Sequence, residues 1–288
     1  IVHISKFEDL AVVANPISDL VSVLAEAFWP GPLTLIMPKS RRVPDNVSAG
    51  LNNVAVRIPA HPVALALLDS AGVPIAAPSA NSFGHTSPTT AAHVLQDLGE
   101  HIDLILDGGE TTVGVESTVV DLTRTPPIIL RPGGLTREEL EQLIGPVGLQ
   151  TRSQSDAGPQ LSPGLLNSHY APHARLILCM GAFPAVLEQI NRLAKQHLRE
   201  GTRVGLLLAD KDQSKIQIPG VPVITLGAAN DLAKIARNLY AGLHKLDDMG
   251  VEVILARNYA AQGLGLAIND RLRRAASQVI TSSDESHG

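Results

Sequence analysis

Two arginines and a group of small polar side chains are the residues of this sequence best suited to bind an anion. Arg57 and Arg131 each lie near the end of a short apolar run, and Ser79, Asn81 and Ser87 follow a third such run. Guanidinium groups bind carboxylates and phosphates through paired hydrogen bonds. The combination predicts a site for a ligand that carries both kinds of group. For either arginine alone, a solvated strand end or a surface ion pair is the alternative.

The stretch over residues 73–89 predicts a strand, a polar loop and the start of a helix. Residues 73–77 are apolar and bounded by glycine and proline, which is typical of a strand covered on both faces. Ser87 before Pro88 predicts an N-cap and a first helical position, with the helix running over residues 89–98. A helix N-terminus beside a polar loop attracts anions. The alternative is a capped connection that holds no ligand.

Apolar runs in the first half of the chain predict an α/β sheet that carries these residues. Strands are predicted over residues 33–37, 54–58, 73–77, 102–106, 117–122 and 127–130. A helix over 62–70 favours a parallel βαβ unit between the second and third of them. Helices are also predicted over 7–13 and 16–28. Thr136 opens a capping-box sequence, which predicts a helix that ends at Gly145.

Five polar side chains lie next to the ends of these predicted strands. They are Arg57, Ser79, Asn81, Ser117 and Arg131. Ligands of open α/β sheets lie beyond the carboxyl ends of the strands, so we expect the five to converge there if the strands are neighbours.

Composition changes near residue 147, where the apolar periodicity gives way to Gln, Ser, Gly and Pro. We predict a first domain over residues 1–146, a linker over 147–172 and a second domain over 173–288. In the second domain, strands are predicted over 176–180, 204–208, 221–226 and 251–256, and helices over 183–199, 231–249 and 266–277. This alternation predicts a smaller three-layer domain with a parallel sheet. Its glycines form no dinucleotide fingerprint, which favours a packing module.

The predicted linker ends with a histidine and a tyrosine side by side. His169 and Tyr170 lie between Pro163 and Pro172, which restrict the backbone on either side. This pattern predicts a fixed pair presented over a pocket. The alternative is an anchor packed against either domain.

Composition and charge exclude several classes of protein. The formal net charge of −5 argues against tight non-specific binding of nucleic acid, although a local basic patch stays open. One cysteine, Cys179, cannot form an internal disulfide and suits a reducing cytoplasm. His169 and His173 are separated by Pro172, which argues against a helical zinc pair, and we predict no metal site formed by the protein. Walker loops, nucleophile elbows and membrane-length apolar runs are absent from the sequence.

Five motifs of the first half resemble, in order, those of the YrdC-like family. They are FWPGPLT at 28–34, VAVRIP at 54–59, APSAN at 77–81, ESTVVD at 116–121 and LRPG at 130–133. The SPG…HYAP stretch and a Rossmann-like second half, with GLGLA at 263–267 and Asn269–Arg274, resemble its two-domain branch, the threonylcarbamoyl-AMP synthases. The resemblance covers essentially the whole chain and implies a YrdC-like twisted open sheet followed by a Rossmann-like domain.

The resemblance also implies a reaction and its partners. L-threonine, bicarbonate and ATP are expected as substrates, with Mg²⁺ carried on the ATP phosphates. The expected products are threonylcarbamoyl-AMP and pyrophosphate. The adenylate is expected to pass to tRNA threonylcarbamoyl-transfer proteins in the cytoplasm, with weak tRNA binding by this chain as a further expectation and no membrane. Catalysis by positioning and electrostatic stabilisation, without a covalent intermediate, is the implied mechanism.

Roles for individual residues follow from the resemblance, motif by motif. Arg57, the Ala77 backbone and Ser117 are expected to hold threonine. ATP is expected to be held by Asn53, Ser79, Ser87, Arg131, His169 and Tyr170. Asn81 is expected to brace the loop. Residue type and position alone indicate Arg57, Arg131 and the serine loop, whereas the roles of Asn53, Ala77 and Ser117 are implied by the resemblance.

The family carries an N-terminal segment with a PTETVYGLG-like stretch and a KGRP-like basic motif, before the strand that corresponds to residues 1–4. The present sequence starts just after that point, and we expect the segment to have been cut off or left out. A chain without it is expected to have weak or absent synthase activity and a destabilised first domain.

Two other functions stay open on the sequence. An RNA-binding module would use Arg57 and Arg131 on a phosphate backbone, and its binding would weaken steeply with salt. A carbamoyl-transferring or nucleotide-hydrolysing enzyme on the same fold is the second alternative, because a fold does not determine its chemistry.

Overall fold

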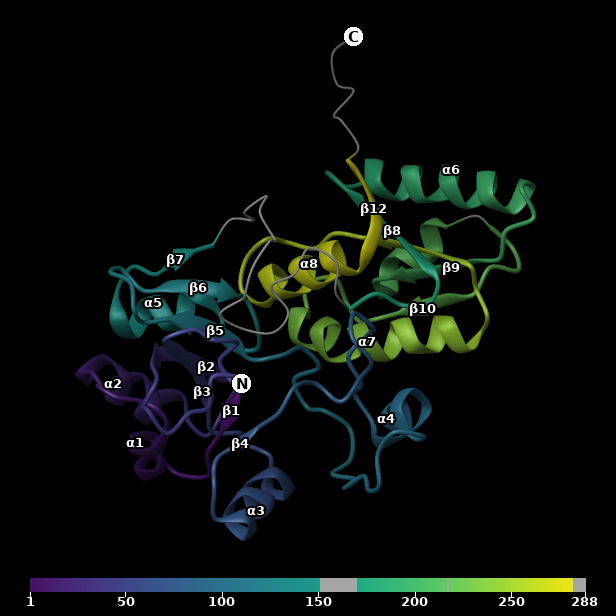
Figure 1. Cartoon of the computed structure of the whole chain (residues 1–288). Helices are drawn as coiled ribbons and strands as arrows, with labels where there is room; N and C mark the ends of the chain where they lie inside the picture. The colour runs from purple at the N-terminus through teal and green to yellow at the C-terminus, as the bar shows by residue number, and fades with distance from the viewer. Residues whose placement is uncertain (151–169, 217, 282–288) are drawn as a thin grey trace. The chain divides into compact units, whose positions relative to one another are not determined.

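The computed structural model describes residues 1–150, 170–216 and 218–281, and the chain forms two compact units (Figure 1). Unit 1 comprises Ile1–Ser79 and Glu116–Asn167, and unit 2 comprises Ala80–Val115 and Ser168–Gly288. The segment Ala80–Val115, which the sequence places in the first domain, is therefore grouped with the C-terminal part of the chain. The domain borders expected at residues 146 and 172 stay a prediction.

Unit 1 contains a seven-stranded mixed sheet in the order β4-β1-β3-β2-β5-β6-β7. Its strands are β1 (Val2–His3), β2 (Leu33–Pro38), β3 (Asn53–Arg57), β4 (Ile75–Ala76), β5 (Thr118–Asp121), β6 (Ile128–Arg131) and β7 (Gly148–Leu149). Neighbours β1/β3, β2/β5 and β6/β7 are parallel, and the other pairs are antiparallel. Four strands predicted from apolar runs, β2, β3, β5 and β6, are confirmed.

One face of this sheet packs against helices and forms the core of unit 1. Besides the 3-10 helix η1 (Phe7–Asp9), the helices of the unit are α1 (Leu10–Val13), α2 (Asp19–Phe28), α3 (Pro62–Ala71) and α5 (Arg137–Ile144). Alternate strand residues such as Leu35 and Val56 join Leu24 of α2 and Leu140 of α5 in one buried cluster. The sheet's other face carries a much smaller apolar cluster around Val119, so it has room for polar side chains.

Three expectations for residues 73–106 are wrong. β4 is a two-residue edge strand, antiparallel to β1, and Val73 is 61% exposed, so the chain forms no parallel βαβ unit here. Residues 102–106 form no strand, because an apolar run needs a neighbour to pair its backbone groups and none is found in the described chain. Helix α4 (Ala91–Leu98) begins later than expected, since the Thr90 side chain accepts the N-terminal hydrogen bond from the His93 N–H at 3.2 Å.

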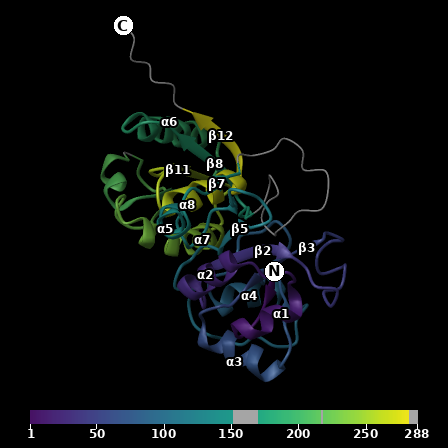
Figure 2. The ribbon, with the colours of Figure 1, turned by 90° about the vertical axis from the view of Figure 1, so that its left-hand side faces the viewer.

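Unit 2 contains a five-stranded sheet in the order β10-β9-β11-β8-β12, and all its pairs are parallel. Its strands are β8 (Arg175–Met180), β9 (Val204–Leu208), β10 (Val223–Thr225), β11 (Val253–Arg257) and β12 (Ala276–Thr281). Helix α6 (Ala185–Arg199) covers one face, and α7 (Leu232–Asp248) and α8 (Leu264–Ala275) cover the other (Figure 2). The 3-10 helix η2 (Asp210–Lys215) follows β9. The predicted three-layer architecture is confirmed; β12 was missed because its edge position leaves little apolar patterning.

Candidate functional site

Arg57, Ser117 and Arg131 lie at one end of the unit 1 sheet. Arg57 ends β3 and Arg131 ends β6, and these two strands run in the same direction. Ser117 directly precedes β5, which runs the opposite way. The start of β5 therefore meets the ends of β3 and β6, and the three predicted residues are brought to one end of the sheet.

The strand register also places these side chains on one face. In the β2–β3 pair, Leu35 pairs with Val56, so Thr34 lies opposite Arg57. In the β2–β5 pair, Thr34 pairs with Val119. Val119 in turn pairs with Arg131 of β6. Paired residues point to the same face of a sheet, and Ser117, two positions before Val119, shares that face. The hydroxyls of Thr34 and Ser117 are 2.7 Å apart. Thr34 was not predicted; its only signal is a polar residue within an apolar strand.

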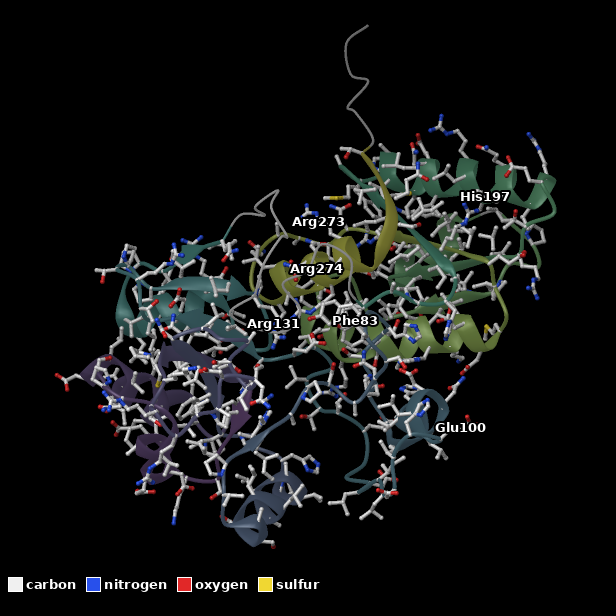
Figure 3. The ribbon with its side chains drawn as sticks, viewed as in Figure 1. Phe83, Glu100, Arg131, His197, Arg273 and Arg274 are labelled. Atoms are coloured by element: carbon white, nitrogen blue, oxygen red, sulfur yellow. The ribbon has the colours of Figure 1, made fainter. Side chains whose placement is uncertain are left out.

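Arg131 holds Ser117 in place at this end of the sheet. Its Nε and Nη2 donate to the Ser117 carbonyl at 3.2 and 3.0 Å, and Nη2 also reaches the Ser117 hydroxyl at 3.2 Å. Arg131 is only 3% exposed and extends from β6 (Figure 3). A Cβ on Gly133 would lie 2.3 Å from the carbonyl of Glu116, so the turn after Arg131 requires glycine.

Arg57 is half-buried and fixed by a hydrogen bond from its Nε to the carbonyl of Gly31 at 2.9 Å. Burial and the neighbouring Arg131 charge lower the pKa of Arg57 to about 10. His3, which pairs with Arg57 in the β1–β3 register, has its pKa lowered to about 4 by burial and by the Arg57 charge. No salt bridge to Arg57 occurs among the described residues. This end of the sheet therefore carries two neighbouring positive charges, one half-buried and one buried.

The two arginines are spaced for a ligand with two anionic groups. Three strand steps separate β3 from β6 in the sheet order. At about 4.8 Å per step, the strand axes are about 14 Å apart. Long arginine side chains can approach each other across that distance, and the Arg131 charge does act on Arg57. A compact anion would satisfy one guanidinium, whereas a longer ligand with separate anionic groups would satisfy both.

Asn53, Ala77 and Ser79 do not lie at the strand ends that carry the two arginines. Asn53 starts β3, four residues before Arg57 and therefore about 13 Å from it along the strand. Ala77 follows the antiparallel strand β4, and its N–H donates to the carbonyl of Ile1 at 3.1 Å. Ser79 is exposed two residues later. Because β4 runs against β1 and β3, the strand end before Ser79 is not the end of the sheet that carries Arg57, and the predicted roles of these residues stay predictions.

The predicted residues of unit 2 lie in a loop and in its core. The Asn81 amide donates to the carbonyls of Ser82 and His85 at 2.9 and 3.2 Å, which closes the loop on itself. The Asn81 Oδ1 is buried and has no hydrogen-bond partner in the described part of the chain. Ser87 is 5% exposed, and its carbonyl is 3.1 Å from His244 Nε2.

Tyr170 is buried in the core of unit 2. It is 1% exposed, its ring centroid lies 5.8 Å from that of Tyr240, and the guanidinium of Arg271 lies 5.1 Å from it on the ring face. This position agrees with the anchor that the sequence left open. His169 and most of the predicted linker lie outside the described residues, so the predicted role of the pair stays a prediction.

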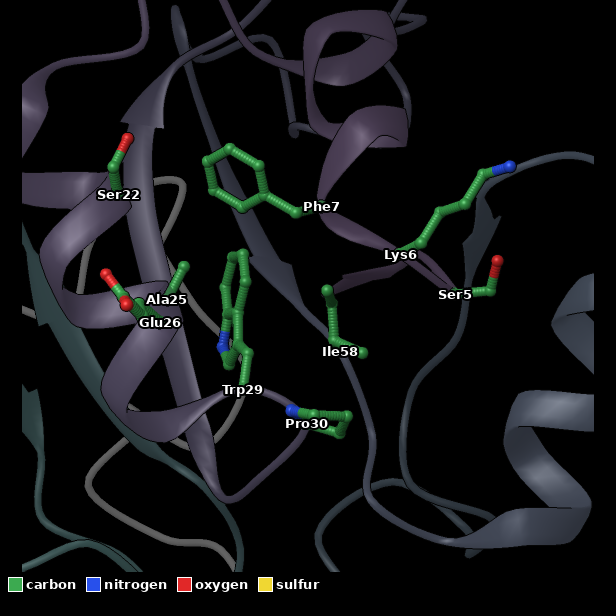
Figure 4. Close-up of a pocket in the computed structure, with 9 residues that line it drawn as sticks. All are labelled: Ser5, Lys6, Phe7, Ser22, Ala25, Glu26, Trp29, Pro30 and Ile58. Carbon is green, nitrogen blue, oxygen red and sulfur yellow. The ribbon is translucent and has the colours of Figure 1, made fainter.

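A separate pocket of about 430 Å³ lies against α2 in unit 1 (Figure 4). Phe7, Trp29 and Ile58 form its apolar part, and Lys6 and Glu26 lie at its edge. None of the residues predicted for binding lines it. Ile58 directly follows Arg57 and therefore points to the opposite side of the strand.

The described residues show no metal centre and no membrane span. No group of three or more His, Cys, Asp or Glu side chains gathers to hold a metal in that part of the chain. The described helices include none that is both long and apolar enough to cross a bilayer.

The fold and the site together define an α/β protein of two compact units, with two arginines at one end of the mixed sheet of the first unit. A family model described as "Telomere recombination" matches residues 1–133, and one described as "Threonylcarbamoyl-AMP synthase, C-terminal domain" matches residues 135–277. The chain is 44% identical to the threonylcarbamoyl-AMP synthase of Pyrococcus abyssi, over 97% of this chain and 80% of that protein. It is 40% identical to the Bacillus subtilis threonylcarbamoyl-AMP synthase, over 96% of this chain and 78% of that protein. The chain belongs to the threonylcarbamoyl-AMP synthase family of enzymes.

Solved structures agree with this assignment. A crystal structure of P. abyssi Sua5 complexed with L-threonine superposes with a TM-score of 0.90 at 43% identity, covering 98% of this chain and 81% of that one. A second structure of P. abyssi Sua5, in which an adjacent histidine and tyrosine are replaced by alanine, superposes with a TM-score of 0.88 at 41% identity, covering 99% and 81%. These matches confirm the predicted fold class.

Proposed function

We propose that this chain joins L-threonine, bicarbonate and ATP to form threonylcarbamoyl-AMP and pyrophosphate. The threonine amine and bicarbonate combine to a carbamate with loss of water. A carbamate oxygen then attacks the α-phosphate of ATP, and pyrophosphate leaves. The observation that carries the proposal is the pair of arginines at one end of the sheet, in a chain of this family and with the fold of a threonine-bound relative.

Each anionic group of the substrates has a counterpart in the described residues. Arg57 binds the threonine carboxylate, and the Ser117 hydroxyl and the Ala77 backbone complete that pocket. Arg131 holds Ser117 and adds positive charge toward the phosphates. Asn53 and Arg57 are at opposite ends of β3, which suits a long ligand with its adenosine at one end and threonine at the other; Ser79 is assigned to the adenosine part by the family resemblance.

Catalysis by this site consists of positioning and electrostatic stabilisation. Negative charge builds up on the α-phosphate during attack, and buried guanidinium groups interact with it more strongly than they would in water. With its pKa near 10, Arg57 stays protonated at neutral pH. ATP enters as its magnesium complex, so the metal belongs to the substrate.

The product is a mixed anhydride, which must be consumed by a group-transfer reaction before water hydrolyses it. We infer that threonylcarbamoyl-transfer proteins acting on tRNA take it up. Direct binding of tRNA by this chain, if it occurs, will be weak, because the net charge is −5.

Pyrophosphate release tests the proposal. The full chain should release pyrophosphate only when threonine, bicarbonate and ATP are all present. Release that is independent of threonine would contradict the synthase reaction and favour a nucleotide-hydrolysing enzyme. RNA association that falls steeply with salt, without any pyrophosphate release, would favour the RNA-binding alternative.

A further inference from the structure

The segment Ala80–Val115 belongs to the first domain by sequence and to unit 2 by its contacts. The family model of the first domain spans residues 1–133 and therefore includes it. The structure nevertheless groups it with Ser168–Gly288. Ser87, which the family resemblance assigns to ATP, lies in this segment and therefore in unit 2.

The loop is paired with the chain just before β8. The N–H of Ala171 donates to the carbonyl of Gly84 at 2.8 Å, and the Thr86 hydroxyl donates to the carbonyl of Tyr170 at 3.2 Å. Thr86 is 3% exposed. These contacts fix the backbone directly before Ser87.

A pair of stacked histidines fixes the backbone at and after Ser87. His244 of α7 donates from Nε2 to the Ser87 carbonyl at 3.1 Å. Its ring stacks on that of His93 in α4, with centroids 4.0 Å apart and an angle of 23° between the planes. His93 Nδ1 accepts from the Thr89 N–H at 3.2 Å, so the two rings hold both sides of the turn that contains Ser87.

Helix α7 also holds the far end of the segment. Arg237 donates from Nε to the carbonyl of Thr112 at 2.8 Å. A Cβ on Gly114 would lie 2.3 Å from the Cα of Arg237, so the backbones are in contact. Leu239 and Leu243 are buried against the parallel sheet, so α7 is anchored in the core of unit 2 while it contacts the segment at Ser87, Thr112 and Gly114.

We propose that His244 is a positioning residue for the synthase reaction: it holds the Ser87 backbone so that the loop presents its side chains to ATP. This inference rests on the proposed function and extends it, because it gives the C-terminal domain a part in nucleotide binding. His244 acts through the loop and is not itself a contact of the substrates.

The test compares His244→Leu, which removes the donor, with His244→Gln, which keeps an N–H donor. The Leu variant should raise the KM for ATP about 3- to 10-fold, the effect of one lost hydrogen bond, with the KM for threonine unchanged. The Gln variant should stay within about twofold of the wild type. His101→Leu serves as the control, since His101 is exposed in the same segment.

Thr86→Val tests the same loop independently, in case His244→Leu does not fold. Thr86→Val removes the hydroxyl that donates to Tyr170 while keeping the side-chain shape, and it should raise the KM for ATP in the same way. Folding of every variant is checked by circular dichroism melting. An unchanged ATP KM in folded His244→Leu and Thr86→Val proteins would overturn the inference, as would a Gln variant as impaired as the Leu variant.

Direct ATP binding, measured by calorimetry on the full chain, separates this inference from the proposed function. Wild-type protein that binds ATP without threonine-dependent pyrophosphate release would refute the proposed function, and the His244 comparison would still be read from the ATP affinities. Wild-type protein that does not bind ATP would overturn both.

Discussion

Arg57 is half-buried and positively charged. Its charge is felt by two neighbours, Arg131 and His3. Burial and the Arg57 charge together keep His3 neutral at pH 7. Arg131 donates hydrogen bonds to Ser117. Arg57 has one hydrogen bond among the described residues, to the carbonyl of Gly31. Arg57 is therefore the guanidinium best placed to bind a ligand.

Replacing Arg57 by alanine should weaken threonine binding by about 1.5–3 kcal/mol, because a charged hydrogen bond is lost. This corresponds to about a 10- to 150-fold rise in Kd. Calorimetry with threonine measures it. Arg41→Ala is the control, since Arg41 is exposed in a loop and should leave the affinity unchanged. An Arg57→Ala protein with wild-type affinity would remove Arg57 from the pocket.

The His3 imidazole should make unit 1 less stable in mild acid. Its pKa is about 4 in the folded chain and about 6.5 in the unfolded chain. Between these pH values His3 is protonated in the unfolded chain and neutral in the folded chain. The free energy of unfolding therefore falls as pH drops from about 6.5 towards 4. Trp29, the only tryptophan of the sequence, lies in the unit 1 core, and its fluorescence reports denaturation of that unit.

A His3→Gln variant provides the comparison for this pH dependence, because glutamine does not titrate. Its denaturation midpoint should fall less between pH 6.5 and about 4 than that of the wild type. Parallel pH profiles of the two proteins would show that His3 contributes nothing to the acid sensitivity.

At the scale of elements, the site depends on strand direction and on well-defined helix ends. β3 and β6 end at the same end of the sheet, and β5 begins there. The loop after β6 leads to α5, whose capping box was predicted from the sequence and is confirmed. The Thr136 side chain accepts from the Glu139 N–H at 3.3 Å, and the Glu139 carboxylate accepts from the Thr136 N–H at 2.8 Å.

Thr136→Ala should lower the stability of unit 1 by about 1 kcal/mol, because an N-cap side chain is lost. Urea denaturation followed by Trp29 fluorescence measures this change, since Leu140 of α5 and Trp29 lie in the same core cluster. Thr136→Ser keeps the capping oxygen and should lose much less. Equal losses in the two variants would mean that the cap does not stabilise α5.

At the scale of the whole molecule, the segment Ala80–Val115 is grouped differently by sequence and by contacts. Sequence assigns it to one domain and contacts assign it to the other. Its close backbone contact with α7 at Gly114 is possible only because that residue has no Cβ. The sequence pattern that favoured a packing module for the second domain stays a prediction, and the His244 comparison tests it.

Gly114→Ala should destabilise unit 2 far more than Gly201→Ala does. Both glycines have φ near +80°, but only at Gly114 would a Cβ collide with neighbouring backbone. Gly201→Ala should cost about 1–2 kcal/mol for its backbone conformation, and Gly114→Ala about 1–3 kcal/mol more for the clash. Circular dichroism melting measures both, while Trp29 fluorescence checks that unit 1 is unaffected. Similar losses would show that the contact with α7 is unimportant.

Local pattern determined much of this protein from the sequence alone. Apolar runs predicted β2, β3, β5 and β6, the strand–helix alternation predicted the parallel sheet of unit 2, and Thr136 marked the start of α5. Arg57 and Arg131 were recognised by residue type and by their places at strand ends. Burial, capping and the character of a strand end depend on residues close together in the chain, and a sequence displays these directly.

Only the tertiary structure decided which strand ends meet and what supports the site. The antiparallel direction of β4 puts the strand end before Ser79 at the other end of the sheet from the end of β3, and the sheet register places Thr34 and His3 beside Arg57. The packing of Ser87 against His244 joins residues 157 positions apart. Such contacts follow from pairing and packing between distant parts of the chain, whose energies local residue patterns do not contain.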